Sequence, residues 1–402
     1  MFAILIFIIY LHQVLYWVWL WQLKEYRIDR FKAGFSKKSL IWQFDLRHWW
    51  RPKLTPRAVT AILISLIFFD FFSIILAPVL VAIAIAISSP PFIFWKKILV
   101  WRAKRKMKNF KGTVVGITGS YGKSSTKELL NAVLRIKYHV LCTQGNNNSE
   151  IGVAQMVLKK LEGDEDFFLV EMGAYKIGEI KNICEIVKPK IGIITGLGDQ
   201  HLELFGSLEN IKKAKYELIN SLLADGFGLV ADKDFKLEEA KNIKAFKNHV
   251  EFDFEKQKFS VKILGKSLIR NVLGVVKVAK YLNLTLPEIS QSLSDDFENI
   301  YPKLLENNII DNSYNSSLES FLSALDYLQV WKGYKKVVVT SGFLELGENA
   351  KSDWEKVVAA AKSVDKLILT KNEKVEFTKT DKTVVLLQGH LSQKIKNYVK
   401  SF

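Results

Sequence analysis

The chain has 402 residues and a net charge of +17, and 49% of its residues are hydrophobic. This length predicts two or three domains, and the apolar content excludes a disordered chain. The two cysteines, Cys142 and Cys184, are too few to stabilise a disulfide scaffold, which favours a reducing compartment. The positive charge is concentrated near the start: residues 1–111 hold 18 Lys or Arg against four acidic residues, whereas residues 112–402 hold 40 against 37. The chain is therefore predicted to join two parts of different kinds.

Residues 1–23 carry no charged side chain and are long enough to cross the ~30 Å apolar layer of a bilayer. A second apolar stretch, residues 58–95, is about twice as long as the ~20 residues that one crossing needs. Pro78 lies near its middle and is expected to interrupt a helix there. Two arrangements fit this stretch: two crossings, or one crossing followed by an interfacial segment.

Basic residues flank the second apolar stretch on both sides. The segment 24–57 has ten Lys or Arg against three acidic residues, and the segment 96–111 has eight against none. Because strongly basic flanks stay on the cytoplasmic side, we expect an even number of crossings between them. We therefore predict a membrane module in a multi-pass protein of the cell membrane, with its catalytic domains in the cytoplasm. The module covers residues 1–111, with spans at about 1–23, 58–77 and 79–95.

Two charged features of this module need a physical explanation. Asp70 would lie inside a span, where a carboxylate costs ~2.5–3.5 kcal/mol, so we expect it to face a partner helix or water. The basic run 101–111 directly follows a span. An anionic lipid surface at the cytoplasmic face explains that run at ~1 kcal/mol per basic residue. Nucleic acid is therefore not expected as a partner.

From residue 113 onward, short β-branched runs alternate with helical patterns, which predicts an α/β fold with a mostly parallel sheet. Alternating apolar residues over 249–264 predict a β-hairpin. A second, smaller α/β series begins at Asn308. The predicted strands are 113–118, 167–171, 190–195, 226–231, 309–311, 336–340, 366–369 and 383–387, and the predicted helices are 123–135, 178–188, 208–223, 316–330, 352–363 and 392–399.

The first predicted strand leads into Gly-Ser-Tyr-Gly-Lys-Ser-Ser-Thr at 119–126 and then into a helix. Such a loop wraps its backbone N–H groups around phosphate oxygens, its lysine reaches the β- and γ-phosphates, and its serine can bind Mg²⁺. Ile117 stands where the strict motif has its first glycine, but the order of strand, loop and helix still predicts a nucleotide site. The expected nucleotide contacts are Gly119, Ser120, Tyr121, Gly122, Lys123, Ser124 and Ser125.

Three further segments follow this loop. A polar, turn-prone loop covers 143–152, Glu-Met-Gly-Ala closes a strand at 171–174, and His-Leu-Glu-Leu-Phe-Gly-Ser at 201–207 precedes Ala-Lys-Tyr-Glu at 214–217. Together they resemble the central domain of the Mur ligases, the ATP-dependent amide ligases of peptidoglycan assembly, and most of all the branch that adds D-alanyl-D-alanine. The smaller domain adds Asp-Asn-Ser-Tyr-Asn at 311–315 and Leu-Glu-Leu-Gly at 344–347.

The resemblance implies an ATP-binding central domain at 112–298 and a Rossmann-like C-terminal domain at 299–402. It also implies that ATP phosphorylates a carboxylate, that an amine attacks the acyl phosphate, and that ADP and phosphate leave. By position, Ser124 and Glu171 would bind one Mg²⁺, and Glu171 with His201 a second. Lys215 matches the lysine that the family carbamylates near the metal, and Lys123 would bind the γ-phosphate. The implied catalytic residues are thus Lys123, Glu171, His201 and Lys215.

The chain departs from the family pattern in three places. The sugar-nucleotide-recognising N-terminal domain is replaced by the apolar module. The adenine-contacting segment keeps only Asn271. In the smaller domain Asp311 is kept as an expected nucleotide contact, but Asn312 replaces a second aspartate, and no arginine follows Arg270.

We therefore predict a membrane-anchored, ATP- and Mg²⁺-dependent ligase that joins a carboxylate substrate to an amine substrate in peptidoglycan precursor or related envelope synthesis. Two alternatives stay open. One is a ligase for another envelope polymer, such as a peptide capsule. The other is a nucleotide-binding membrane scaffold without ligase activity.

Overall fold

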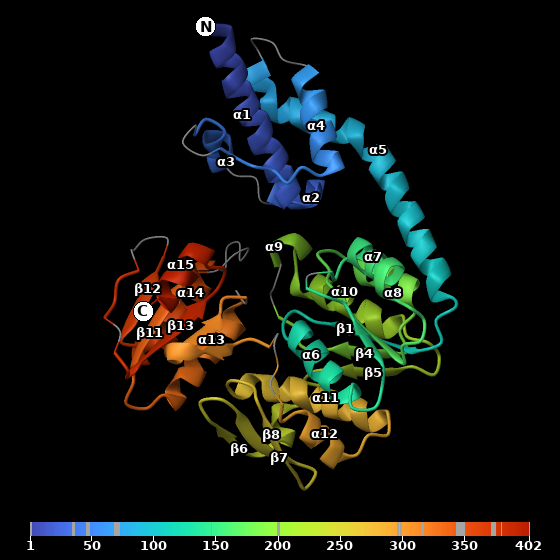
Figure 1. Cartoon of the computed structure of the whole chain (residues 1–402), viewed down its shortest axis with the longest axis vertical. Coiled ribbons are helices and arrows are strands. Elements are labelled where there is room, and N and C mark those ends of the chain that lie inside the picture. The colour runs from blue at the N-terminus through green and yellow to red at the C-terminus, as the bar shows by residue number, and fades with distance from the viewer. Residues whose placement is uncertain are drawn as a thin grey trace. The chain divides into compact units, whose positions relative to one another are not determined.

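A computed structural model of the chain describes residues 2–401, except for 34–36, 46–48, 68–72, 146, 199–201, 296, 298–299, 315–316, 343–349, 371–374 and 379. The chain forms two compact units, Met1–Arg102 and Ala103–Phe402. Figure 1 shows helices alone in the described part of the first unit, and sheets covered by helices in the second.

Unit 1 is built on apolar helices. The buried residues of its fourth helix, Ala58, Ala61 and Ser65, recur every three or four positions and make one narrow face. This face packs on the first helix, where the Tyr10 hydroxyl donates to the Ser65 carbonyl at 2.6 Å. Trp17 is fully buried in the same core. The helices are α1 (Phe2–Leu23), α2 (Ile28–Ala33), α3 (Lys37–Trp42), α4 (Pro56–Ile67) and α5 (Ser73–Met107), the last of which continues into unit 2.

Two helical segments, Ile4–Leu23 and Leu76–Met107, are long and apolar enough to cross a membrane. The expected division of 58–95 into spans at Pro78 is wrong, because α5 runs through Pro78. Pro78 is the sixth residue of α5, where it removes one backbone hydrogen bond near the helix start. Helix α4 has 12 residues, or about 18 Å, which is shorter than the ~30 Å apolar layer. The helices therefore do not match the three expected spans, and Asp70 lies outside the described residues.

Unit 2 begins with a five-stranded, fully parallel sheet in the order β2-β3-β1-β4-β5. Its central strands are buried on both faces, as their continuous apolar runs predict. In register, Ile117 pairs with Glu171 and Thr118 with Ile194, so the carboxyl ends of three strands meet at one edge. The strands are β1 (Thr113–Thr118), β2 (Val140–Cys142), β3 (Phe167–Glu171), β4 (Ile191–Ile194) and β5 (Phe227–Val230).

Helices cover this sheet. Helix α6 buries Thr126, Lys127, Leu130 and Leu134 at helical spacing and packs on β1, β2 and β3. Helix α10 packs on β1 and β4. The helices after the strands are α6 (Lys123–Leu134), α7 (Glu150–Lys160), α8 (Glu179–Val187), α9 (Leu202–Phe205) and α10 (Leu208–Asn220).

A three-stranded antiparallel sheet, β6-β7-β8, follows and shares one apolar core with the first sheet. The predicted hairpin is confirmed, because β7 buries Val250, Phe252 and Phe254 and pairs with β8 in antiparallel register. Helix α11 packs on α6, and α12 packs on β8 and α6. The elements are β6 (Lys241–Ala245), β7 (Val250–Phe254), β8 (Gln257–Val261), α11 (Ile269–Tyr281) and α12 (Leu286–Ser292).

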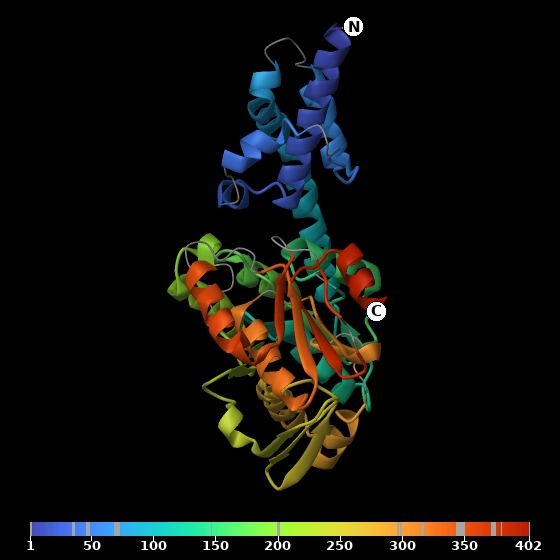
Figure 2. The ribbon, with the colours of Figure 1, turned by 90° about the vertical axis from the view of Figure 1, so that its left-hand side faces the viewer.

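The last sheet has the order β12-β11-β13-β10-β9, with β9 antiparallel to the rest. Along β13, Val384 and Leu386 enter one apolar core, and Val385 and Leu387 enter another. Figure 2 accordingly shows helices on both sides of these strands, drawn in orange to red. The elements are β9 (Lys303–Leu305), β10 (Ile309–Asn312), α13 (Leu318–Tyr327), β11 (Lys335–Thr340), α14 (Ala350–Ala360), β12 (Lys366–Leu369), β13 (Thr383–Gln388) and α15 (Gln393–Lys400).

The predicted alternation of strand and helix is confirmed in both parts of unit 2. The expectation of a loop throughout 143–152 is wrong at its end, because α7 begins at Glu150. The Ser149 hydroxyl caps that helix by accepting a hydrogen bond from the Gly152 N–H at 3.3 Å. The domain boundaries at 111 and 298, and the description of the smaller domain as Rossmann-like, stay predictions.

Candidate functional site

The loop between β1 and α6 has the geometry that a phosphate-binding loop needs. Gly119 has a φ of 153° and Gly122 a φ of 79°, conformations that side chains other than glycine rarely adopt. A Cβ on Gly122 would lie 2.2 Å from the Asn271 amide nitrogen. Helix α6 starts directly after this residue, so its N-terminal N–H groups and dipole face the loop. Ser124 and Ser125 are half-buried in the first turn.

The end of β4 holds this loop in place. The Ser120 N–H donates to the Gly196 carbonyl at 2.8 Å, and the Ser120 hydroxyl donates to the Gly198 carbonyl at 3.0 Å. Thr195 Oγ1 donates to the Tyr121 carbonyl. The conformation of the loop therefore depends on β1, which it follows, and on the residues after β4, and not on the sequence of the loop alone.

Helix α11 contributes two side chains to the same loop. Asn271 is 3% exposed and donates to Thr126 Oγ1 at 2.8 Å and to the Gly122 carbonyl at 3.3 Å. Arg270 donates from Nη2 to the Tyr121 hydroxyl at 2.8 Å and forms an ion pair with Asp232. Asn271, expected to contact adenine, therefore supports the loop backbone in this structure, and its contact with a base stays a prediction.

Glu171 ends β3 and is 3% exposed. Its Oε2 accepts from the Lys127 ammonium at 3.3 Å, and its Oε1 accepts from Asn148 Nδ2 at 3.4 Å. Its backbone N–H donates to Thr143 Oγ1 at 2.9 Å. The loop 143–149 is thereby joined to the strand end that carries the predicted metal ligand.

Lys123 and Lys215 are electrostatic neighbours. The Lys123 ammonium donates to the Gly119 carbonyl at 2.8 Å, and burial lowers its pKa against the opposing effect of Glu171. Lys215 is 3% exposed on α10. Burial first, and then the charge of Lys123, lower the pKa of Lys215 to about 7, although Glu179 and Glu217 act in the opposite direction. A lysine with this pKa is neutral in an appreciable fraction at physiological pH.

Tyr314 connects the smaller domain to two of these side chains. Burial raises the pKa of Tyr314, the nearby Glu171 carboxylate raises it further, and a hydrogen bond with the Ser124 side chain opposes both. Ser124 and Glu171, predicted to share a metal ion, therefore have a common neighbour. Tyr314 also stacks on Tyr301, with ring centroids 5.4 Å apart.

The other predicted residues either lie outside the described residues or contact different partners. His201 and the segment 344–347 lie outside the described residues. Asp311 accepts hydrogen bonds from the backbone N–H and the hydroxyl of Ser313, at 2.9 and 2.5 Å. Asn312 is buried, and its Nδ2 donates a hydrogen bond to Gln388 Oε1 at 2.7 Å. Within the described ranges, no three His, Cys, Asp or Glu side chains gather into a metal site, and both metal ions stay predictions.

The sequence reasoning missed three side chains of this site. Lys127 could have been found, because it follows Lys123 by four residues and so shares its face of α6. Asn148 stands in a loop already singled out as polar, but nothing in the sequence shows which strand it contacts. Arg270 precedes Asn271 directly, yet its contact with Tyr121 joins residues 149 positions apart.

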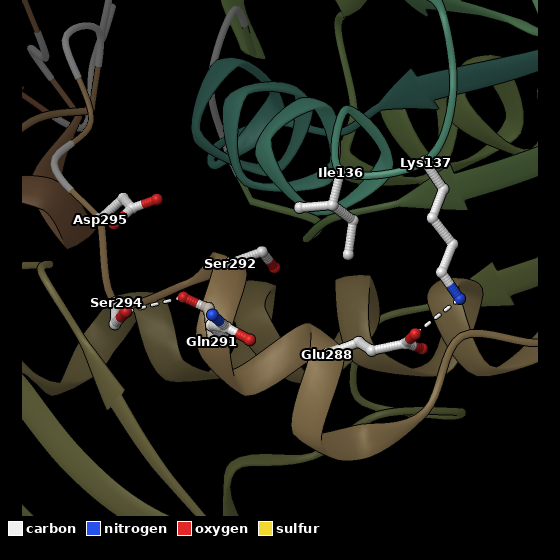
Figure 3. Close-up of a pocket in the computed structure, with 7 residues that line it drawn as sticks. All are labelled: Ile136, Lys137, Glu288, Gln291, Ser292, Ser294 and Asp295. Carbon is white, nitrogen blue, oxygen red and sulfur yellow. Dashed lines mark hydrogen bonds and ion pairs between the residues drawn. The ribbon is translucent and has the colours of Figure 1, made fainter.

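A pocket of about 430 Å³ lies at the other end of α6 (Figure 3). Helix α6 has 12 residues and is about 18 Å long, so the pocket is well separated from the phosphate-binding loop. Figure 3 shows the Lys137–Glu288 ion pair, 2.6 Å long, at its rim. We assign it no part in the candidate site. Its lining residues are Ile136, Lys137, Glu288, Gln291, Ser292, Ser294 and Asp295.

Comparison with known proteins agrees with this geometry. Residues 117–258 match the Mur ligase middle domain. The UDP-N-acetylmuramoyl-tripeptide–D-alanyl-D-alanine ligase of Bacillus subtilis is 29% identical over 292 residues, which cover 66% of this chain and 63% of that protein. The ligase of the same name from Escherichia coli is 30% identical over 285 residues, which cover 62% of each chain. The chain thus spans less than two thirds of the length of these curated relatives.

Solved structures extend the likeness to the fold. The MurF ligase of Thermotoga maritima, in complex with ADP, is 24% identical, with a TM-score of 0.66 over 76% of this chain and 83% of that one. MurF of Acinetobacter baumannii is 21% identical, with a TM-score of 0.64 over 76% of this chain and 80% of that one. Unit 2 therefore has the α/β fold of these ligases. Residues 117–258 thus match a Mur ligase middle domain, and the chain is similar in sequence to the D-alanyl-D-alanine-adding ligases.

The geometry of Gly122 leads to a first prediction. Gly122→Ala places a methyl group against Asn271 and forces the loop to shift, so we expect ATP affinity to fall by about tenfold or more, equivalent to about 1.4 kcal/mol. Titration with a fluorescent ATP analogue measures the change. Gly163→Ala is a matched control, because Gly163 also has a positive φ but no atom within 4 Å of an added Cβ. Equal losses of affinity in the two variants would contradict the prediction.

The lowered pKa of Lys215 leads to a second prediction. Only the neutral amine adds CO₂, and with a pKa of about 7 its neutral fraction rises from about 9% at pH 6 to about 91% at pH 8. At fixed CO₂ pressure, carbamate on Lys215 should therefore increase over this interval, measured by ¹³C NMR with labelled CO₂. Lys215→Arg should remove the signal. A carbamate level that does not change between pH 6 and pH 8 would contradict the prediction that Lys215 is the carbamylated residue.

Proposed function

We propose that this protein is an ATP- and Mg²⁺-dependent ligase that forms an amide bond between a carboxylate and an amine in peptidoglycan precursor or related envelope synthesis. One observation carries the proposal. Lys123, Glu171 and Lys215 are electrostatic neighbours beside the glycine-containing loop at the N-terminus of α6. A scaffold without activity has no need for a buried lysine of lowered pKa at this position. The names of the relatives support the choice of envelope chemistry.

The residues of the site fit ATP and Mg²⁺. Gly119 and Gly122 hold the loop backbone at positive φ values, a conformation in which its N–H groups can bind phosphate oxygens, and Lys123 supplies a positive charge there. The Ser124 hydroxyl and the Glu171 carboxylate are oxygen donors of the kind that Mg²⁺ prefers. When bound, Mg²⁺ would neutralise charge on the transferring phosphoryl group.

The proposed reaction has two steps. The γ-phosphoryl group moves from ATP to the substrate carboxylate, which gives an acyl phosphate and ADP. The amine then attacks the acyl carbon, its nitrogen loses a proton, and phosphate leaves as the amide forms. Lys123 and the N–H groups at the start of α6 would stabilise the charge that develops in the first step. Lys215, carbamylated as in the family, would present an anionic oxygen instead of a cation.

The test of the ligase proposal is ADP release that requires both acceptors. The first probes are UDP-N-acetylmuramoyl-tripeptide and D-alanyl-D-alanine, the compounds in the names of the relatives, followed by a panel of other carboxylates and amines. We expect Lys123→Ala to lower turnover by about 10²–10³-fold, the usual cost of losing one donor to a developing charge. Lys137→Ala, at the far end of α6, should leave it unchanged. ATP turnover that no acceptor alters would exclude the ligase and favour the scaffold.

We further propose that α1 and α5 attach the protein to a membrane whose anionic lipids contact the basic end of α5. Apolar side chains in the middle of α5 are exposed, among them Ile83 at 44% and Ile87 at 56%. Beyond them Trp95 and Trp101 are exposed beside basic residues, an arrangement typical of the level of lipid headgroups. The basic residues of this end are Lys96, Lys97, Arg102, Lys104, Arg105 and Lys106.

Extraction with alkaline carbonate tests the attachment. The full chain should stay in the membrane pellet. Ile83→Lys with Ile87→Lys should release a large part of it, because each lysine costs ~2.5–3.5 kcal/mol in the middle of a bilayer. Ile136→Lys alters an isoleucine that is 48% exposed in unit 2, and it should be retained like the wild type. Release of the unaltered chain by carbonate would refute the attachment.

A further inference from the structure

Lys127 is a buried cation that the proposed reaction does not use. It lies one helical turn after Lys123 on α6, and its side chain is 4% exposed. Its ammonium donates to the Thr143 carbonyl at 2.8 Å and to Glu171 Oε2 at 3.3 Å. Glu128, at 3.8 Å, is the other carboxylate near it and is more exposed. Lys127 therefore links α6 to the carboxyl ends of both β2 and β3.

The partner that matters is Glu171, because burial of an unpaired carboxylate is strongly unfavourable. Lys127 supplies the opposite charge, while the neutral amide of Asn148 takes the other carboxylate oxygen at 3.4 Å. Lys123 donates instead to carbonyl groups of the phosphate-binding loop, Gly119 at 2.8 Å and Ser120 at 3.3 Å. The protein itself therefore supplies the positive charge that compensates the Glu171 carboxylate.

This pairing has a consequence for divalent cations. A buried carboxylate without a counter-charge attracts a divalent cation on its own, whereas a carboxylate paired with an ammonium group carries no net charge and attracts it weakly. The phosphates of ATP would bring the negative charge that the pair lacks. Metal binding would then require nucleotide.

We propose that Lys127 is a positioning residue that balances the charge of Glu171 and makes divalent-cation binding depend on bound nucleotide. The inference rests on the proposed function, because it takes Glu171 as a metal ligand. Lys127 acts through Glu171 and not on the substrate. A purely structural ion pair between Lys127 and Glu171 would stabilise the fold by the same amount with and without metal. In the proposed role, the ion pair stabilises the fold less once a metal ion binds Glu171.

The test is Mn²⁺ binding to the full-length protein, followed by electron paramagnetic resonance, with Mn²⁺ alone and with Mn²⁺ plus a non-hydrolysable ATP analogue. The wild type should bind Mn²⁺ weakly alone and much more tightly with the analogue. Lys127→Met and Lys127→Gln should bind Mn²⁺ alone roughly tenfold more tightly than the wild type, since a nearby positive charge is lost. Lys127→Arg should restore the wild-type value, and Glu171→Gln combined with Lys127→Gln should cancel the gain.

Thermal unfolding is a second measurement, and it distinguishes the proposed role of Lys127 from a purely structural one. Without metal, the Tm of Lys127→Gln should fall, and Mn²⁺ should raise it by more than it raises the wild-type Tm. Lys137→Met, which removes an exposed lysine paired with Glu288, should behave like the wild type in both measurements. If Lys127→Met does not fold, Lys127→Gln carries the test, because its amide can still donate to Thr143.

The outcomes separate this inference from the function on which it rests. If Mn²⁺ alone binds no more tightly to the Lys127 variants than to the wild type, or if their loss of Tm is the same with and without Mn²⁺, the inference is wrong. If the wild type binds neither the nucleotide analogue nor Mn²⁺ with it, the proposed function itself fails.

Discussion

One edge of a parallel sheet in unit 2 holds a buried carboxylate and three lysines, and the stability of the site depends on how these charges are balanced. Glu171 is compensated by Lys127 in direct contact, and Lys123 is held by carbonyl groups of its own loop. Burial and the charge of Lys123 lower the pKa of Lys215 to about 7, although Glu179 and Glu217 act in the opposite direction. Because a buried unpaired charge is costly, each group is either paired, surrounded by carbonyl oxygens, or readily neutralised.

This balance also explains how the site could accept a highly charged ligand. At this edge the Lys123 ammonium donates to two carbonyl oxygens of the loop, and its positive charge favours an anion such as a nucleotide phosphate over a free cation. The loop that would receive it is held by β4 on one side and by Asn271 on the other. A rigid loop of this kind loses little conformational freedom when phosphate binds.

The apolar helices place a different constraint on the same chain. The chain spans less than two thirds of the length of the curated relatives, and two long apolar helical segments, Ile4–Leu23 and Leu76–Met107, precede its first strand. Five residues separate the end of α5 at Met107 from the start of β1 at Thr113, a reach of at most about 20 Å. Under the proposed attachment, the first strand of the ATP-binding sheet is thus tethered close to the helix that meets the lipid. A tether of this length raises the local concentration of the site for any envelope substrate held at the membrane.

Local pattern was enough to predict much of the fold. The strands at 113–118, 167–171 and 366–369 have the predicted bounds, because each is a short apolar run between turn residues. Pattern failed at β2, which has three residues, and at α7, whose first turn stands in a polar segment that resembles a loop. It also failed at Pro78, because the effect of a proline depends on its place in the helix and not on its presence.

By itself, the sequence determined the position of the glycine-rich loop, the resemblance to the Mur ligases and the choice of candidate ligands, since these depend on residue types in a fixed order along a strand, a turn and a helix. Only the tertiary structure decided that Lys127 neutralises Glu171, that Arg270 reaches Tyr121 and that Asn271 supports Gly122. The physical reason is that these contacts join residues 44 to 149 positions apart, and the parallel register of the strands and the packing of α11 on α6 bring them together. Sequence spacing carries no information about such pairs until the sheet has formed.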